Sequence, residues 1–376
     1  MSPPCRTRPR NWRKASDPPE YKRKRSWQMS NLPLAGVRVI DMSWLLPGPF
    51  CTGILADLGA DVVKVEPPSG DYYQDVVPGT YAVINAGKIR RRLDLKSGEG
   101  RAELSRLIAQ ADVLIEGFRP GVMARLGFDF PKVRAINPAI IYASISGYGQ
   151  SGPLSDRPGH DVNYMAQAGA LSIPDTIGKP SARGGLPVGD LSAGLYTAVN
   201  IIAALRAKAA GQAEACHIDM SITEAILHMA QVRYADYLSD TAGGRNWHHL
   251  LGGNGVFKTS DGVGLALGIV EPKFWNSFWS ICGQPPGTET GLSEAERRER
   301  IEAEIAARDS AFWEERMTAA DLPFTRVLDP AEALSSPLFA ERGMIHQVAG
   351  PEGRKIPAVA LPGKMVPAGR RDSSAF

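Results

Sequence analysis

The sequence contains few cysteines and lacks any long apolar run. Its four cysteines are scattered over 376 residues, with no C-x-x-C pair and no His/Cys cluster. This spacing argues against a disulfide framework and a structural zinc site, and it is typical of a reducing compartment. No uninterrupted apolar segment reaches the roughly 18 residues that a membrane span needs. The C-terminal Ser-Ala-Phe is neither a retention nor a peroxisomal signal. We therefore expect a cytoplasmic protein that does not enter a membrane.

Several common catalytic and nucleotide-binding motifs are also missing. The chain has no P-loop, no G-x-S-x-G and no H-E-x-x-H, and no G-x-G-x-x-G follows the first predicted strand. These absences argue against a P-loop nucleotide site, a serine-hydrolase elbow, a zinc protease and a dinucleotide site of the usual kind. No metal site is predicted.

The net charge of +3 comes from the N-terminal segment. Residues 1–30 hold nine of the 43 basic residues but only two of the 40 acidic ones, so the remaining chain is mildly acidic. This segment is rich in proline and has no apolar periodicity, which predicts a disordered tail. Two interpretations are open: an arm that binds nucleic acid, or an extension upstream of a natural start at Met29. The acidic residues in the tail argue against a mitochondrial presequence.

Strand-like and helix-like segments alternate after the tail. The predicted strands are 37–41, 61–66, 112–117 and 140–146, and the helices between them are 50–58, 99–110 and 120–126. Alternation of this kind predicts an α/β fold, with a doubly wound, Rossmann-like large domain. Helices at 191–210 and about 220–239 follow, then a flexible loop at 251–255 and a smaller α+β region. The predicted division is a tail (1–30), a large domain (31–220), a linker helix with the glycine loop (221–255), a small domain (256–335) and a return segment that packs on the large domain (336–376).

Three residues are candidates for chemistry, although each has an ordinary structural explanation. His160 begins a probable helix, where it could simply cap or pack. Asp190 comes immediately before a long helix, which is an ordinary N-cap position. Glu271 follows an apolar run, where a carboxylate is usually solvated. Together, a His and an Asp on opposite sides of one carbon could remove and return a proton.

Five stretches of the chain resemble the family III CoA-transferases, which include the α-methylacyl-CoA racemases. The stretches are L-A-D-L-G-A-D-V-V-K-V-E-P-P (55–68), L-D-L-K-S (93–97), A-D-V-L-I-E-G-F-R-P-G-V-M-A-R-L-G (111–127), G-Y-G-Q-S-G-P (147–153) and V-G-D (188–190). The resemblance implies an interlocked homodimer in which each chain is an open ring. It also implies a Rossmann-like large domain that binds CoA, with the thioester near the dimer interface.

The resemblance assigns the central catalytic role to Asp190. In the transferases this Asp is a nucleophile that forms acyl-anhydride and aspartyl-CoA intermediates, whereas in the racemases it is one of two proton-transfer groups. The racemases carry G-H-D-[IV]-N-Y, which matches residues 159–164, and I-V-E-P-K-F (269–274) continues the racemase pattern. The resemblance therefore implies a 2-methylacyl-CoA epimerase in which His160 and Asp190 are the two bases and Glu271 supports His160. A CoA-transferase that moves CoA between carboxylic acids is the alternative.

Coenzyme A is implied as part of the substrate, with no prosthetic group and no metal. The positions matched to CoA binding are Lys64, Asn85, Lys88, Arg119, Arg125, Gly159 and Tyr164. Cations at such positions suit the CoA phosphates. The glycine loop 252–255 is expected to close over the substrate.

Overall fold

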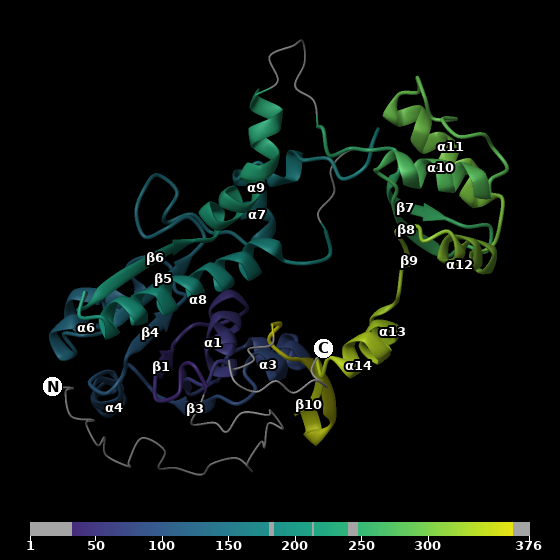
Figure 1. Cartoon of the computed structure of the whole chain (residues 1–376). Coiled ribbons are helices and arrows are strands. Elements are labelled where there is room, and N and C mark those ends of the chain that lie inside the picture. Colours follow the sequence, from purple (N-terminus) through teal and green to yellow (C-terminus); the bar gives the residue numbers. More distant parts are fainter. Residues whose placement is uncertain (1–31, 180–183, 213, 240–246, 364–376) are drawn as a thin grey trace. The chain divides into compact units, whose positions relative to one another are not determined.

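The computed structural model describes residues 32–179, 184–212, 214–239 and 247–363 (Figure 1). The predicted tail, with both of its interpretations, lies outside these residues. The chain folds into two compact units. Of the described residues, the first unit comprises 32–156, those within Asp190–Ser221 and 347–363, and the second comprises those within Arg157–Gly189 and Ile222–His346.

The first unit is built on one parallel sheet of six strands in the order β3-β2-β1-β4-β5-β6. The strands are β1 (Arg38–Asp41), β2 (Asp61–Glu66), β3 (Ile89–Arg92), β4 (Val113–Glu116), β5 (Ile141–Ser146) and β6 (Cys216–Ser221). Every residue of β4 and β5 is buried, as expected for strands that are covered on both faces. The order reverses between β1 and β4, which is the strand arrangement of a Rossmann fold. The predicted doubly wound α/β fold is confirmed.

Helices cover the sheet in the first unit. They are α1 (Pro47–Asp57), α2 (Tyr73–Val76), α3 (Pro78–Ile84), α4 (Gly98–Ile108), α5 (Val122–Leu126), α6 (Phe130–Ile136) and α8 (Val188–Ala209). Leu104, Leu107 and Ile108 of α4 belong to one apolar cluster with Leu114 of β4 and Tyr142 of β5. Ser97 caps α4, because its hydroxyl accepts the amide hydrogen of Gly100 at 3.0 Å.

Helix α8 is, by length and composition alone, long and apolar enough to cross a membrane. The sequence analysis did not predict such a helix, because polar residues interrupt the apolar residues of this segment. The helix also has the features of a core helix, since Ala193, Ala198 and Ile201 are buried. Gly194 lies so close to α1 that an added Cβ would stand 2.6 Å from the carbonyl oxygen of Pro47. This close approach fixes the N-terminal half of α8 against α1.

The second unit contains a small antiparallel sheet in the order β7-β8-β9, surrounded by helices. Its elements are α7 (Asp161–Gln167), α9 (Ile222–Ser239), β7 (Asn254–Lys258), β8 (Gly264–Gly268), α10 (Pro272–Ile281), α11 (Glu294–Ala306), α12 (Ser310–Ala319), β9 (Phe324–Arg326), α13 (Pro330–Ser335) and α14 (Pro337–Glu341). Three buried tryptophans, Trp275, Trp279 and Trp313, form much of its core. Strands β10 (Ile345–Ala349) and β11 (Lys355–Val359) form a separate two-stranded sheet.

The glycine segment 252–255 is more ordered than the sequence predicts. Gly252 and Gly253 are buried, and Asn254 and Gly255 already belong to β7. The amide of Gly252 donates to Glu294 Oε2 at 2.7 Å, and the carbonyl of Gly253 accepts from Ile269 at 2.9 Å. The prediction of a flexible loop is therefore wrong. Glycine is needed at these positions because the backbone packs closely against its neighbours, and the segment has a fixed conformation. Closure over a substrate stays a prediction.

Candidate functional site

Asp190 lies in the first turn of α8 rather than before the helix. The helix begins at Val188, so the prediction that Asp190 is its N-cap is wrong. Tyr73, in α2, lies within electrostatic reach of Asp190. Burial raises the pKa of the Tyr73 phenol, and the negative charge of Asp190 raises it further. Sequence reasoning missed Tyr73, because α2 is a single turn with no motif around it.

His160 occupies the N-cap position of α7, with extended backbone angles. Its side chain is exposed, and its backbone amide donates to Asn163 Oδ1 at 3.0 Å. Tyr164, one turn into the helix, is buried and donates its phenolic hydrogen to the carbonyl oxygen of Gly159 at 2.5 Å. Gly159 and Tyr164 thus fix the turn that carries His160, and their contact with CoA stays a prediction.

A buried hydrogen bond ties the segment of His160 to the start of α8. Asp161 is 4 % exposed, and its Oδ1 accepts the backbone hydrogen of Gly189 at 2.8 Å. An added Cβ on Gly189 would stand 2.9 Å from that oxygen and 2.7 Å from Ile226 Cδ1, so a larger residue there would displace the Asp161 and Ile226 side chains. His160 and Asp190 are each one residue away from this bond along the chain. Asp161 is the Asp of the G-H-D motif, so the residue that forms this hydrogen bond was visible in the sequence although its role was not predicted.

Glu271 is the N-cap residue of α10 and is exposed. Within the described residues no hydrogen bond or ion pair joins Glu271 to His160. Pro272 at the first helical position fixes the local backbone, so that Glu271 stands at the point where the chain leaves β8 and enters α10. Its support of His160 therefore stays a prediction.

Three residues predicted to bind CoA lie inside the protein. Lys64 is fully buried, where its ammonium donates to the carbonyl oxygen of Ser43 at 2.8 Å and pairs with Asp71 at 3.2 Å. Lys88 is likewise buried and donates to Asp41 Oδ2 at 3.1 Å and to Asn85 Oδ1 at 2.9 Å. Lys64 and Lys88 thus hold the segment after β1 through the carbonyl oxygens of Ser43 and Pro49, and Asn85 holds Lys88. The contact of these three residues with CoA stays a prediction.

The Asp41–Lys88 pair is charged at neutral pH. Although burial favours the neutral acid, the positive charges of Lys88 and Lys64 and two hydroxyl donors lower the pKa of Asp41 to about 2. Burial lowers the pKa of Lys88 to about 8, and the Asp41 carboxylate opposes that change. A buried pair of this kind costs desolvation free energy but fixes its surroundings in one arrangement.

The carboxyl ends of β1 and β4 present aromatic and basic side chains at the reversal of strand order. Trp44 follows β1 and meets Phe118, which follows β4, edge to face with ring centroids 5.7 Å apart. Arg119 and Arg125 are exposed just beyond. Ligands of open parallel sheets bind at this position, outside the carboxyl ends of the strands where the order reverses.

A hollow of about 320 Å³ adjoins this region of the first unit. Its lining includes Glu116, Arg119, Ser144 and His217. Glu116 is 3 % exposed, and burial raises the pKa of its carboxyl to about 7. Ser144 Oγ and His217 Nε2 are 2.9 Å apart. The hollow therefore contains an acid that titrates near neutrality, which the sequence did not identify because Glu116 stands inside a strand.

The described residues contain no candidate metal site. In the ranges 32–179, 184–212, 214–239 and 247–363, no group of three or more His, Cys, Asp or Glu side chains is placed to hold an ion.

Known proteins match this chain over most of its length. The model of "CoA-transferase family III" matches residues 34–374. The chain is 33% identical over 340 residues to an acetyl-CoA:oxalate CoA-transferase of Acetobacter aceti, with 85% of this chain and 86% of the relative covered. It is 32% identical over 320 residues to the alpha-methylacyl-CoA racemase of Homo sapiens, with 82% and 81% covered. The crystal structure of a CaiB/BaiF family protein from Brucella suis superposes with a TM-score of 0.78 at 26% identity and covers 89% of this chain and 93% of that one.

Proposed function

We propose a function for this chain from the premise that it belongs to CoA-transferase family III. The family includes both CoA-transferases and racemases among the relatives of this chain, so its substrates are CoA-linked. Our proposal is that the chain racemises 2-methylacyl-CoA thioesters by proton transfer at the α-carbon.

The observation that carries this proposal is the hydrogen bond between Asp161 and the amide of Gly189. It links the turn that carries His160 to the turn that carries Asp190, and each candidate base is one residue from it. The bond is buried, so both backbone segments are held in place before a substrate binds. Two-base chemistry requires this kind of preorganisation, because both groups must face one carbon.

In the proposed reaction Asp190 takes the α-proton from one enantiomer. The C–H bond breaks, its electron pair moves into the thioester carbonyl, and an enolate forms. Protonated His160 then donates its proton to the opposite face, and the electron pair returns to the α-carbon as the new C–H bond. The reverse direction exchanges the protonation states of the two bases. The N-terminus of α8 would favour the negative charge that develops on the enolate oxygen.

CoA binding is proposed at the carboxyl ends of β1 and β4. Phe118 and Trp44 supply flat apolar faces there, and Arg119 and Arg125 supply positive charge for phosphates. The buried Lys64 and Lys88 would contribute indirectly by holding the loop after β1, with Asn85 positioning Lys88. No prosthetic group takes part in this proposal.

The racemase proposal is tested by deuterium exchange. An (R)-2-methylacyl-CoA incubated with the enzyme in heavy water should gain α-deuterium and become a mixture of enantiomers. His160→Ala should lower exchange in at least one direction by about 10²–10⁴-fold, because general acid–base groups contribute rate factors of that size. His228→Ala, on the exposed side of α9, is the control. A wild-type enzyme that exchanges no deuterium would contradict the proposal.

A CoA-transferase is the second candidate, favoured by the relatives that carry that name. Here Asp190 would attack the thioester carbonyl, so that a carboxylic anhydride forms and the CoA thiolate leaves. The thiolate would then attack the aspartyl carbonyl, which forms an aspartyl-CoA thioester and releases the donor acid. The carboxylate of the acceptor acid would attack this thioester to give a second anhydride and free the thiolate, and attack of the thiolate on the acceptor's carbonyl would yield the new CoA thioester and regenerate the Asp190 carboxylate. Trapping with hydroxylamine should label Asp190 as the hydroxamate. New thioester formed from a free acid, with no α-exchange, would select this candidate over the racemase.

A further inference from the structure

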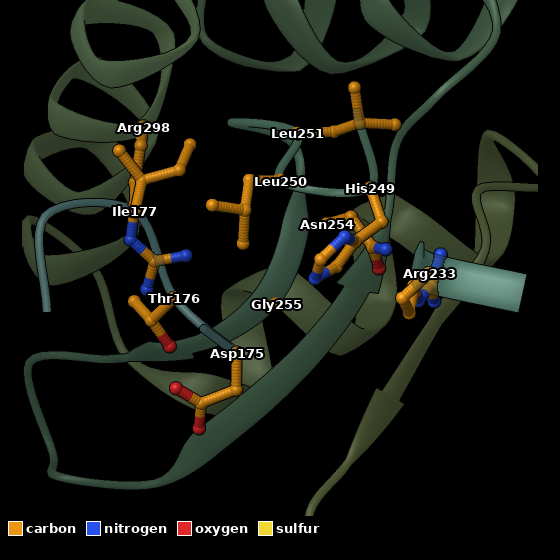
Figure 2. Close-up of a pocket in the computed structure, with 10 residues that line it drawn as sticks. All are labelled: Asp175, Thr176, Ile177, Arg233, His249, Leu250, Leu251, Asn254, Gly255 and Arg298. Carbon is orange, nitrogen blue, oxygen red and sulfur yellow. The ribbon is translucent and has the colours of Figure 1, made fainter. Parts of the chain in front are cut away.

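Each unit contains a hollow, and the two hollows differ in how their charged side chains are compensated. The hollow of the second unit, of about 380 Å³, is lined by Arg298, Arg233 and Asp175 among others (Figure 2). Arg298 is ion-paired there with Glu302, with Nε and Oε1 2.9 Å apart. The hollow of the first unit instead contains Glu116, which is 3% exposed and pairs with no cation among the described residues. A buried acid without a cation costs folding free energy.

Glu116 holds the backbone at the point where the chain leaves the sheet. The pairing of β4 with β5 ends at Glu116 and Ser144. Two residues further on, the amide of Phe118 donates to Glu116 Oε2 at 2.8 Å. The carboxyl group thus replaces a neighbouring strand as the acceptor for this amide. The chain turns at Gly117, where an added Cβ would stand 3.3 Å from Ser43 Cβ.

The carboxyl group of Glu116 is itself held by neighbouring strands. It is hydrogen-bonded to the hydroxyl of Ser144 on β5, and Ser144 Oγ lies 2.9 Å from His217 Nε2 on β6. The His217 ring stacks on Phe130 with centroids 5.2 Å apart. Burial lowers the pKa of His217, so its ring is neutral at pH 7 and adds no charge to this network. Glu116 therefore has a fixed orientation toward the loop.

The segment that Glu116 holds carries two of the proposed CoA contacts. The Phe118 ring meets Trp44 edge to face, and Arg119 is the next residue along the chain. A shift of the Phe118 backbone would move both side chains away from their places. The hydrogen bond is available in either protonation state of Glu116, because a neutral carboxyl group keeps an acceptor oxygen.

We propose that Glu116 is a positioning residue for CoA binding, acting through the amide of Phe118 to hold residues 117–119 in the conformation that receives CoA. The proposal rests on the proposed CoA site at the carboxyl ends of β1 and β4, and it holds for racemisation and for transfer alike. An apolar side chain of similar size would suit the buried position better than an acid does. Stability and CoA binding should therefore change in different directions when Glu116 is replaced.

The test is binding of free CoA to the full-length protein at pH 8, measured by isothermal titration calorimetry without turnover. Glu116→Met removes the acceptor and should raise the Kd about 10- to 100-fold, as expected for the loss of a charged hydrogen bond. Urea unfolding should show that this variant is no less stable than the wild type, because no ionised carboxyl group is then buried. Glu116→Gln keeps an acceptor oxygen and should bind CoA like the wild type.

A matched control comes from the same hollow. The hydroxyl of Tyr142 donates to the carbonyl oxygen of Phe128 at 3.1 Å, so it holds a different segment. Tyr142→Phe should leave the Kd of CoA unchanged. Ser144→Ala, which removes the hydroxyl that orients Glu116, should raise it about 2- to 10-fold, the effect of a neutral hydrogen bond.

Three outcomes would contradict the role of Glu116. The first is a Glu116→Met variant that binds CoA as tightly as the wild type. The second is a loss of stability and binding together that Glu116→Gln does not restore. The third, decisive if Glu116→Met does not fold, is unchanged CoA affinity in Ser144→Ala. A wild type that binds CoA but exchanges no deuterium would contradict the racemase alone, whereas a wild type that binds no CoA would overturn this inference together with the proposed CoA site.

Discussion

At the scale of single residues, Glu116 and Lys88 are buried ionisable groups whose pKa values depart from the ordinary range in ways that can be measured. The pKa of Glu116 is raised from 4.5 to about 7, chiefly by burial and to a smaller extent by the negative charge of Asp219, against the hydrogen bonds from Ser144 and Phe118. The folded chain therefore binds more protons than the unfolded chain between these two pH values. The contribution of Glu116 to stability is fully present below pH 4.5 and is lost as the pH rises through 7.

Replacing Glu116 with glutamine should remove this pH dependence. Glu116→Gln should gain stability relative to the wild type at pH 8, by about 3 kcal/mol at most, since one pKa unit corresponds to about 1.4 kcal/mol. At pH 4 the two proteins should be nearly equal. Urea unfolding at both pH values measures the difference, and Glu315→Gln at an exposed position is the control. Equal pH profiles for Glu116→Gln and the wild type would contradict the high pKa.

Lys88 should contribute to stability more than to CoA binding. Lys88→Met would leave the buried Asp41 carboxylate without its nearest cation, and breaking a buried pair costs about 3–5 kcal/mol. Adding Asp41→Asn should recover part of that loss. Lys96→Met, at an exposed position, should cost almost nothing. A folded Lys88→Met of normal stability with a raised KM for the CoA thioester would instead show that this ammonium contacts CoA.

At the scale of elements, the glycine segment before β7 depends on close backbone packing. A Cβ on Gly253 would stand 2.1 Å from the carbonyl oxygen of Ile269 and 2.8 Å from the Trp275 ring. Gly253→Ala should therefore destabilise the second unit by about 1–3 kcal/mol or more, the cost of overpacking. Gly79→Ala in α3 meets no atom within 4 Å and should change stability by less than about 1 kcal/mol. Thermal unfolding followed by tryptophan fluorescence would compare the two, and equal melting temperatures would contradict the packing argument.

The elements also show which parts of the fold the sequence can predict. Strand β2 was predicted with its observed bounds because a buried parallel strand is a continuous β-branched run. Strands β3 and β6 were missed, since both are edge strands of the sheet and are rich in charged or polar residues. Strand β3 has three consecutive arginines after Ile89, and β6 has a polar or charged residue at every second position. Edge strands are covered less completely, so their sequences carry a weaker apolar signal.

The candidate site was predictable only where a motif marked it. His160, Asp190 and Glu271 could be named from short motifs, but the start of α8 was placed too late, because Val188 and Gly189 precede the Ala-rich run. Tyr73 and Glu116 gave no signal, since their roles depend on which distant segments they meet. The burial of Lys64 and Lys88 was also invisible, because a lysine in a strand or after a turn is usually solvated.

At the scale of the whole molecule, we propose a homodimer, interlocked as the family resemblance implies. Helix α8 leaves Leu195 49% and Val199 54% exposed in one chain. These residues are four apart on the helix, so they share one face. Large apolar side chains grouped on one exposed face often mark a contact with another chain. Covering this face with a second copy would also account for the apolar composition of α8, which resembles that of a membrane span.

Charges placed on that face should separate the dimer. We expect the wild type to have twice the chain mass of 40.5 kDa by light scattering, and Leu195→Lys combined with Val199→Lys to shift it toward one chain mass. The control combines Leu338→Lys with Val359→Lys, which are 59% and 56% exposed and lie outside α8. The control should keep the dimer mass. The α8 variant should also lose exchange activity, because the resemblance places the thioester near the dimer interface. A monomeric wild type, or an α8 variant that stays dimeric, would show that this face has another role.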